Sequence, residues 1–442
     1  MSAGTEQAQP RCALAPFNNP TADIVLRSSD RTDFRVRSAI VAEASEVFAG
    51  MFESPQPPRG ASGVDDNADY VGDTPVVQLA EDAKTLEALL RLCYPVADPV
   101  VDGGQQLRRV LAAAMKYAME EAIAVMRAQL RALIRTSPFE GWVIACKLKL
   151  EEDARRAAFT LYSAVRPFDN QDATLSTISA GQYFRLRRFL ACNGTVGPTY
   201  TFAEPNSWDT DGNARPQAPL PTRPSSVTFQ DRPFADVVCR ASDGKEFLSH
   251  RVYLAAASTL LRDRLLALAA EEPGASTQTP STAAGAQSFP VLEFPDTAGA
   301  TLFILLELCY PGRDNLFLQY SLGSVRDVCA LVRVAKTYEL SGVVSTLHGV
   351  FRYQTQKTPL LAYLLASHAQ FPAGVIFNAE ECIFRDGRPP SAYGWYPEME
   401  SMTAVAYHAL VVKHERHEQS GLSEHVVCGP TAPCKRRRTG GY

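Results

Sequence analysis

The chain has 442 residues, of which 46% are hydrophobic and 21% are charged, and its formal net charge at pH 7 is −4. This composition is close to the globular average and excludes wholesale disorder and the fibrous classes. The length suits two large domains or about three ordinary ones. The charge balance does not indicate a polyanionic partner.

The sequence also indicates neither a membrane protein nor a secreted one. The N-terminal sequence has no basic cluster followed by an apolar stretch, so no secretory signal is expected. The longest apolar run, residues 301–311, carries Glu307 and is about half as long as a membrane span. The ten cysteines form no C-x-x-C pair, which is typical of reduced thiols. We expect a protein of the cytoplasm, the nucleus or both, with no membrane partner.

One sequence pattern occurs twice. Residues 23–45 align without a gap to residues 236–258, and nine of these 23 pairs are identical. The match returns at two later landmarks, residues 92–95 with 308–311 and residues 114–117 with 335–338. Landmarks that keep their order indicate that one module is present in two copies.

Each copy predicts the same elements in the same order. A strand (24–27; 237–240) leads through a turn to a second strand around Phe34 or Phe247, and the two form a hairpin. One apolar helix (39–52; 252–268) and a low-complexity loop (53–75; 271–289) follow. A short strand (76–79; 291–294) then leads to a helix that ends at Cys-Tyr-Pro, because proline stops it.

The next helix of each copy has one buried stripe. Its members are spaced i, i+3, i+4, i+7 and i+10, and they are Leu107, Val110, Leu111, Ala114 and Tyr117, matched by Val328, Leu331, Val332, Ala335 and Tyr338. The expected organisation is a flexible N-terminal tail (1–19), a module (20–135), a helical extension (136–192), a Pro/Gly-rich linker (193–231), a second module (232–345), a helical extension interrupted at 371–397 (346–420) and a disordered basic tail (421–442).

Both copies share a run of residues that resembles a known family. The second copy has Asp236, Phe247, His250, Arg251, Leu254, Ser258, Tyr310, Ala335 and Tyr338. The first copy has Asp23, Phe34, Val41, Ser45, Phe52, Tyr94, Ala114 and Tyr117, with Arg37 where the family usually has histidine. This pattern resembles the BTB/POZ fold, and the first copy in particular is similar to BTB proteins of fungi. The resemblance implies an α+β fold with two modules, each a small mixed sheet flanked by helices and followed by a helical extension.

The resemblance also implies candidate interface residues. In BTB dimers the aspartate and the basic residue after the histidine position form a charged pocket at the subunit interface. The second copy keeps Asp236, His250 and Arg251 for this role. The first copy has Asp23 and Arg37, but Ser38 stands where the second basic residue would be. Since a buried unpaired carboxylate is costly, Asp23 must find another cation or stay solvated. Ordinary backbone capping is the alternative role for both aspartates.

No catalytic or metal-binding motif is present. The chain lacks the Walker A, dinucleotide-binding, nucleophile-elbow and H-E-x-x-H patterns. One histidine and cysteine cluster near the C-terminus fits no common zinc finger and favours a helix end with a loose tail; it consists of His414, His417, His425, Cys428 and Cys434. We therefore expect no enzyme, no cofactor and no metal.

Two arginine-rich segments could contact other macromolecules. Residues 183–189 interleave aromatic and basic side chains, as single-strand nucleic-acid sites do. An amphipathic helix explains them equally well, with Arg185, Arg187 and Arg188 solvated, so a nucleic-acid partner is not expected. The run Lys435, Arg436, Arg437, Arg438 is typical of a nuclear-import signal and also of a solvated chain end.

These features together predict a non-catalytic interaction protein that dimerises or scaffolds through BTB domains. Its expected partners are other BTB proteins or itself, and pairing of the two copies within one chain is favoured because a linker of this length lets them meet. The alternatives are a substrate adaptor that binds a cullin scaffold in a ubiquitin ligase, and a nuclear transcriptional regulator. The hydrophobic-x-Glu element frequent in such adaptors is not evident at Phe52 and Glu53.

Overall fold

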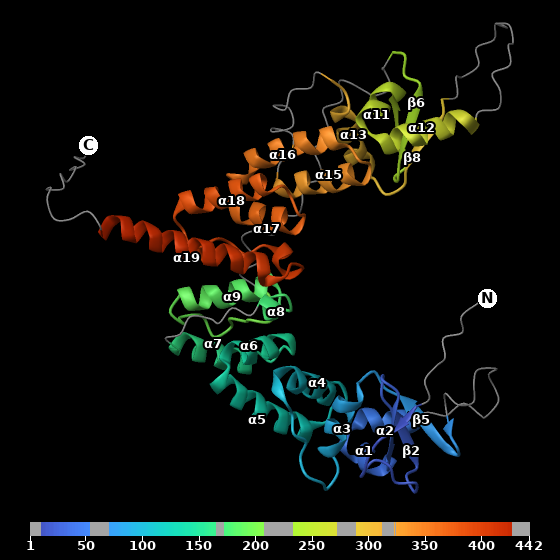
Figure 1. Ribbon diagram of the computed structural model, residues 1–442, viewed down its shortest axis with the longest axis vertical. Helices are drawn as coiled ribbons and strands as arrows, with labels where there is room; N and C mark the ends of the chain where they lie inside the picture. Colours follow the sequence, from blue (N-terminus) through green and yellow to red (C-terminus); the bar gives the residue numbers. More distant parts are fainter. Residues whose placement is uncertain are drawn as a thin grey trace. The chain divides into compact units, whose positions relative to one another are not determined.

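The computed structural model describes residues 10–53, 70–164, 172–206, 233–271, 289–311, 322 and 324–426 (Figure 1). The chain divides into two compact units. The first contains residues 1–174 and 185–205, and the second contains residues 175–184 and 206–442. Each unit combines a small mixed sheet with many helices, which confirms the expected α+β class.

The first unit begins with a five-stranded sheet in the order β1-β3-β2-β5-β4. The strands are β1 Arg11–Cys12, β2 Ile24–Arg27, β3 Thr32–Val36, β4 Tyr70–Val71 and β5 Thr74–Gln78. β2 and β3 form the expected antiparallel hairpin, and β5 lies parallel to β2. All of β2 is buried, so its one charged side chain, Arg27, is paired with the buried Asp33 at 2.6 Å.

The N-terminal segment differs from the flexible tail that its composition predicts. Strand β1 pairs in parallel with the start of β3. Phe17 is 1% exposed, and its ring lies 6.0 Å from that of Phe34 and 5.3 Å from that of Tyr94. Burial of this ring offsets the entropy lost when the segment is ordered. Residues 1–9 of the expected tail lie outside the described residues.

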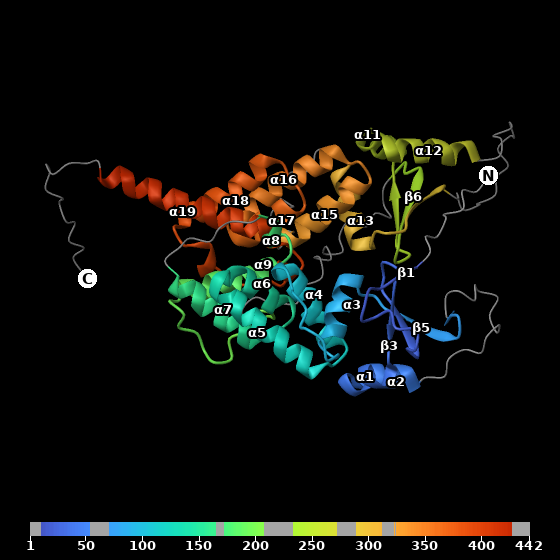
Figure 2. The same cartoon turned by 60° about the horizontal axis from the view of Figure 1, so that its bottom comes forward.

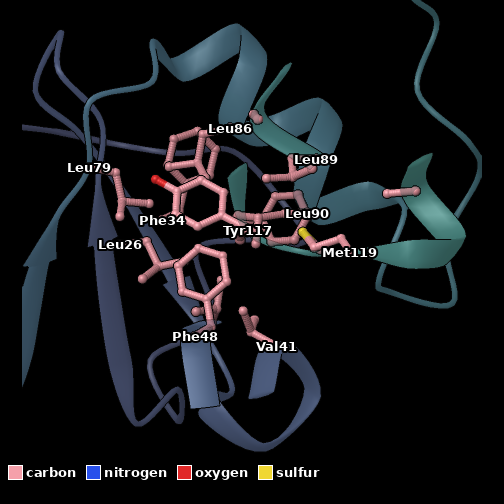
Figure 3. Close-up of a cluster of buried hydrophobic side chains, with 14 of the residues drawn as sticks. Leu26, Phe34, Val41, Phe48, Leu79, Leu86, Leu89, Leu90, Tyr117 and Met119 are labelled. Atoms are coloured by element: carbon pink, nitrogen blue, oxygen red, sulfur yellow. The ribbon is translucent and has the colours of Figure 1, made fainter. Parts of the chain in front are cut away.

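Helices complete the first unit. They are α1 Ser38–Ala44, α2 Glu46–Glu53, α3 Ala83–Arg91, α4 Gly103–Lys116, α5 Glu120–Thr136, α6 Pro138–Lys147, α7 Glu151–Ser163 and the later part of α9 Ala180–Ala191. The short α8 Asp172–Leu175 lies at the division between the units. In the close-up, side chains from the sheet, α2, α3 and the end of α4 converge on one core around Phe34, Phe48 and Tyr117 (Figure 3).

The single helix predicted over residues 39–52 is in fact two helices separated at Ser45. This residue is extended, with φ −154°. Its hydroxyl accepts a hydrogen bond from the Phe48 amide at 3.1 Å and donates one to the Tyr117 carbonyl at 2.5 Å. The serine thus begins α2 as a cap and ties it to the end of α4. Ser258 does the same in the second copy, where it donates to the Tyr338 carbonyl at 2.6 Å.

The second unit contains a three-stranded sheet in the order β7-β6-β8. Its strands are β6 Val237–Ala241, β7 Glu246–Ser249 and β8 Val291–Phe294. Its helices are α11 Arg251–Ala257, α12 Thr259–Glu271, α13 Gly299–Leu308, α15 Val325–Thr337, α16 Ser341–Thr355, α17 Pro359–His368, α18 Ala373–Asp386 and α19 Ala404–Val426, with 3-10 turns η2 Pro390–Ala392 and η3 Pro397–Glu400 before α19. β6 and β7 again form the expected hairpin, with β8 parallel to β6.

Three other expectations need correction. The predicted interruption at 371–397 contains α18, and α19 continues beyond residue 421, where a disordered tail was expected. Residues 193–206 of the predicted linker are not wholly free, because Tyr200 and Phe202 are buried among aromatic rings. The rest of that linker, residues 207–231, lies outside the described residues.

The repeat extends beyond the modules into the helical extensions, which the sequence comparison did not find. Pro138 and Pro359, 221 positions apart, both start a helix. At the same spacing, Lys149 and Gln370 both follow that helix with a positive φ, 57° and 51°. Few side chains are identical here, so only the backbone and the burial pattern reveal the correspondence. We call residues 15–191 repeat one and residues 227–426 repeat two.

Candidate interaction sites

Asp23 in repeat one is exposed and holds the start of α1. The Ser38 amide and hydroxyl donate to its two carboxylate oxygens at 2.8 and 2.6 Å. Partial desolvation raises the pKa of Asp23, but the hydrogen bonds from Ser38 lower it more, so this pKa lies below its usual value. Arg37 instead donates through its guanidinium to the Thr21 hydroxyl at 3.1 Å. A short polar side chain therefore occupies the place that a cation would take.

Asp236 in repeat two holds the start of α11 in the same way. The Arg251 amide donates to its carboxylate at 2.7 Å, and the Arg251 guanidinium Nε donates to the Asp236 carbonyl at 3.1 Å. Asp236 and Arg251 thus contact each other through backbone groups, and their role in a charged interface pocket stays a prediction. Both aspartates also cap a helix, which is the alternative role expected from the sequence.

The residue before Ser38 and the residue before Arg251 each contact a tyrosine. In repeat one the Arg37 amide donates to the Tyr94 hydroxyl at 2.8 Å. In repeat two the His250 amide lies 3.0 Å and its ring Nδ1 2.9 Å from the Tyr310 hydroxyl, while Nε2 lies 3.0 Å from the Pro233 carbonyl. His250 is thus fixed through both ring nitrogens, whereas the Arg37 side chain turns to the surface.

Repeat two exposes apolar side chains beside Asp236 and Arg251. Phe234 is 93% exposed and Val252 is 66% exposed. The equivalent positions of repeat one are Thr21 and Ala39, which are smaller or polar. An exposed phenylalanine and valine next to an aspartate and an arginine form a surface suited to protein contact. The two module faces are therefore chemically different.

A groove with an acidic rim runs along repeat one. Two adjoining pockets of about 470 and 450 Å³ share Glu43, Ala44 and Cys93. Their lining also includes the apolar side chains of Leu92 and Met119. Burial raises the pKa of Cys93 to about 12, so this thiol stays neutral in the groove.

Four exposed glutamates line this groove, and they are Glu43, Glu46, Glu120 and Glu121. None of them takes part in an ion pair within the described part of the chain. Repeat two keeps apolar residues or cysteine at the positions of Leu92, Cys93 and Met119, although Glu339 replaces Ala118. It has uncharged side chains at the four acidic positions, namely Ala256, Thr259, Ser341 and Gly342. The fold therefore does not require the acidic rim, whose chemistry suits a partner with basic side chains.

The remaining candidates from the sequence are placed differently. Arg185, expected in solvent, is fully buried and donates to the carbonyls of Phe202 and Ala203. The carbonyl partners come from a loop that the helical pattern could not place beside it. His414 is 3% exposed near the Phe384 ring, on which the His417 ring stacks. No group of three or more potential metal-ligand side chains occurs among the described residues. Lys435, Arg436, Arg437 and Arg438 lie outside them.

Comparison with protein families settles the class of the modules. The BTB/POZ domain model matches residues 15–133 and again residues 227–354, more than half of the chain. The chain belongs to the BTB/POZ family. Its two copies are thus both BTB modules, of a non-enzymatic family that mediates protein–protein interaction. None of the curated proteins compared with this BTB chain matches it. No helix in its described ranges has the length and apolar character needed to cross a membrane.

Proposed function

We propose that this BTB protein is a non-catalytic scaffold whose two modules pair with each other within one chain. The observation that carries the proposal is the chemical difference between the two module faces. Repeat two presents Phe234 and Val252 beside Arg251, whereas repeat one presents Thr21 and Ala39 beside Ser38. Two different faces suit a contact between unlike partners better than a contact of one face with its own copy.

In-chain pairing is also favoured by concentration. Two modules in one polypeptide meet at an effective concentration on the order of millimolar, above that of a separate partner chain in a cell. The apolar side chains exposed on repeat two would then be covered by the other module of the same molecule.

Light scattering on the purified full-length chain tests this proposal. In-chain pairing gives a mass near 48.2 kDa at micromolar concentration. A stable mass of twice that value would contradict it. If that dimer dissociates in the variant Phe234→Thr/Val252→Ala, repeat two joins separate chains; if it dissociates on removal of residues 1–135, repeat one does. Leu266→Ala, another apolar side chain exposed on repeat two, serves as the control.

A second candidate function is recruitment of a separate protein, such as the cullin scaffold of a ubiquitin ligase. The acid-rimmed groove of repeat one favours this function. Its four carboxylates repel one another, and a partner with basic side chains would reduce this repulsion. The same light-scattering experiment includes an arm with a purified cullin N-terminal domain. An adaptor forms a complex that Glu46→Lys disrupts, whereas Thr259→Lys, its counterpart in repeat two, has no effect.

A further inference from the structure

Two short equivalent segments meet inside the second unit. Residues 178–184 open α9, the last helix of repeat one, and residues 402–408 open α19, the last helix of repeat two. Their sequences, Ile-Ser-Ala-Gly-Gln-Tyr-Phe and Met-Thr-Ala-Val-Ala-Tyr-His, align position by position at a spacing of 224. We call these two segments the clasp.

The backbone contacts of the clasp are reciprocal. The Ala180 amide donates to the Met402 carbonyl at 2.8 Å, and the Ala404 amide donates to the Ile178 carbonyl at 3.0 Å. Exchange of each residue for its equivalent in the other repeat converts one of these hydrogen bonds into the other. Between them, Ser179 and Thr403 form an antiparallel bridge of equivalent residues.

The side chains follow the same two-fold relation. The equivalent rings of Tyr183 and Tyr407 pack edge to face with centroids 6.0 Å apart. On either side of them, Tyr183 contacts His408 at 5.5 Å, and Tyr407 contacts Phe184 at 5.9 Å. These two contacts are again equivalents of each other. All four rings are at most 8% exposed, so the clasp is a buried aromatic interface.

We infer that the clasp is the surface through which the two repeats pair, and that each segment's partner is the equivalent segment of the same chain. An interface that presents the same patch from both sides is isologous, the kind that joins the subunits of a two-fold dimer. The helical extensions thus carry a pairing contact of their own, in addition to the contact proposed between the module faces. This inference rests on the proposed pairing within one chain and names the residues responsible.

Glu400, which precedes α19, makes a further contact with the repeat-one segment of the clasp. The Glu400 carboxylate accepts from the Ser179 hydroxyl at 2.9 Å and from the Trp395 indole at 3.0 Å. It lies directly over Gly181, so that a Cβ atom added at this position would collide with it. The equivalent of Gly181 in repeat two is Val405, which is exposed.

A disulfide between the bridged residues tests the inference in the full chain. The two flanking hydrogen bonds make Ser179 and Thr403 a non-hydrogen-bonded antiparallel pair, whose Cα atoms are typically about 4.5 Å apart, within reach of a disulfide. The variant Ser179→Cys/Thr403→Cys is oxidised, separated by mass without reductant, and mapped by peptide mass spectrometry. We expect the 179–403 link in the monomeric species. Ser179→Cys/Val405→Cys is the matched control and should link far more slowly.

Each outcome of the disulfide experiment either supports or contradicts the clasp. A folded variant that forms no 179–403 link overturns the clasp. A link found only in a species of twice the mass overturns the assignment of the partner to the same chain. Addition of Gly181→Val, which places the repeat-two side chain against Glu400, should slow formation of the link about tenfold or more. An unchanged rate would also count against the clasp.

The proposed function and this inference can fail separately. A mass near 48.2 kDa without the disulfide leaves in-chain pairing standing and assigns it to another surface. A dimer with the disulfide between chains leaves the clasp standing and removes in-chain pairing.

Discussion

The two modules differ in the side chain that contacts an equivalent tyrosine hydroxyl. In repeat one Glu81 accepts from the Tyr117 hydroxyl at 2.5 Å and from the Lys116 ammonium at 2.9 Å. In repeat two the corresponding residue is Thr297, whose hydroxyl lies 3.4 Å from that of Tyr338. Backbone contacts establish this correspondence, because the carbonyls of Glu81 and Thr297 accept from the equivalent amides of Ser29 and Ser242.

The carboxylate makes the stability of repeat one dependent on pH. Burial raises the pKa of Glu81, but the hydrogen bonds from Lys116 and Tyr117 lower it more, to below the ordinary value of 4.5. Burial, together with the acceptor Glu81, raises the pKa of Tyr117 to about 12. A depressed carboxyl pKa in the fold adds stability above about pH 4.5, and this contribution is lost as the pH falls through the folded value.

We therefore predict that Glu81→Gln lowers the free energy of unfolding by about 1 kcal/mol at pH 7, because the Lys116 partner is half exposed and screened. The loss should shrink as the pH falls below 4.5, because the native carboxyl gains its proton as the pH falls through its lowered pKa. Urea unfolding at pH 7 and at pH 3 measures it. Thr297→Val in repeat two is the control and should have the same effect at both. A loss that is equally large at pH 3 would refute the ionic contribution.

At the scale of elements, the Ser45 hydroxyl connects α2 to the end of α4. The serine also separates α1 from α2 and caps α2. Since the hydroxyl is buried, its removal leaves the Phe48 amide and the Tyr117 carbonyl without this partner.

Ser45→Ala should cost about 1–3 kcal/mol of stability, and Ser258→Ala in repeat two should cost a similar amount. Thermal unfolding of the full chain, followed by circular dichroism, measures both. Ser345→Ala, at an exposed serine within α16, is the control and should change stability little. If the two buried serines behave like the exposed one, the bridging role is wrong.

The elements also show what a single sequence can predict. Apolar periodicity located the α4 and α15 stripes, and strand patterns located both hairpins, because these signals are local. The sequence does not reveal the break at Ser45, because no proline or glycine marks it and the carbonyl that holds the serine is 72 residues away. The sequence does not reveal α18, because Pro372 and Gly387 indicate a loop, whereas they are its N-cap and its left-handed C-cap.

The candidate sites were predictable to a similar extent. The family pattern named Asp236 and Arg251 as interface residues, which stays a prediction; in the structure the Arg251 backbone amide donates to the Asp236 carboxylate. It could not show that Ser38 would hold Asp23, nor that residues 178–184 would meet their own equivalents, because both depend on contacts across the chain. The acidic groove is also assembled from three separate segments.

At the scale of the whole molecule, the basic run at residues 435–438 predicts where the protein resides. Four adjacent cations suit the acidic groove of an import receptor, so deletion of residues 435–438 should shift a tagged full-length protein from nucleus to cytoplasm. Fluorescence microscopy measures the ratio between the two compartments. A variant with alanines at the same four positions controls for the change in length. If the intact protein is never nuclear, the run is only a solvated chain end.

Because both halves of the clasp are encoded in one gene, each half can mutate alone. In a homodimer every substitution appears in both subunits, so the position after the tyrosine would hold the same residue on both sides of the contact. Here Phe184 packs on Tyr407, while His408, its equivalent, lies 2.8 Å from the Tyr183 hydroxyl. Gly181 and Val405 have diverged in the same manner around the single carboxylate of Glu400. Fusion of the two repeats thus allows evolution to refine one side of a symmetric contact while the other side preserves it.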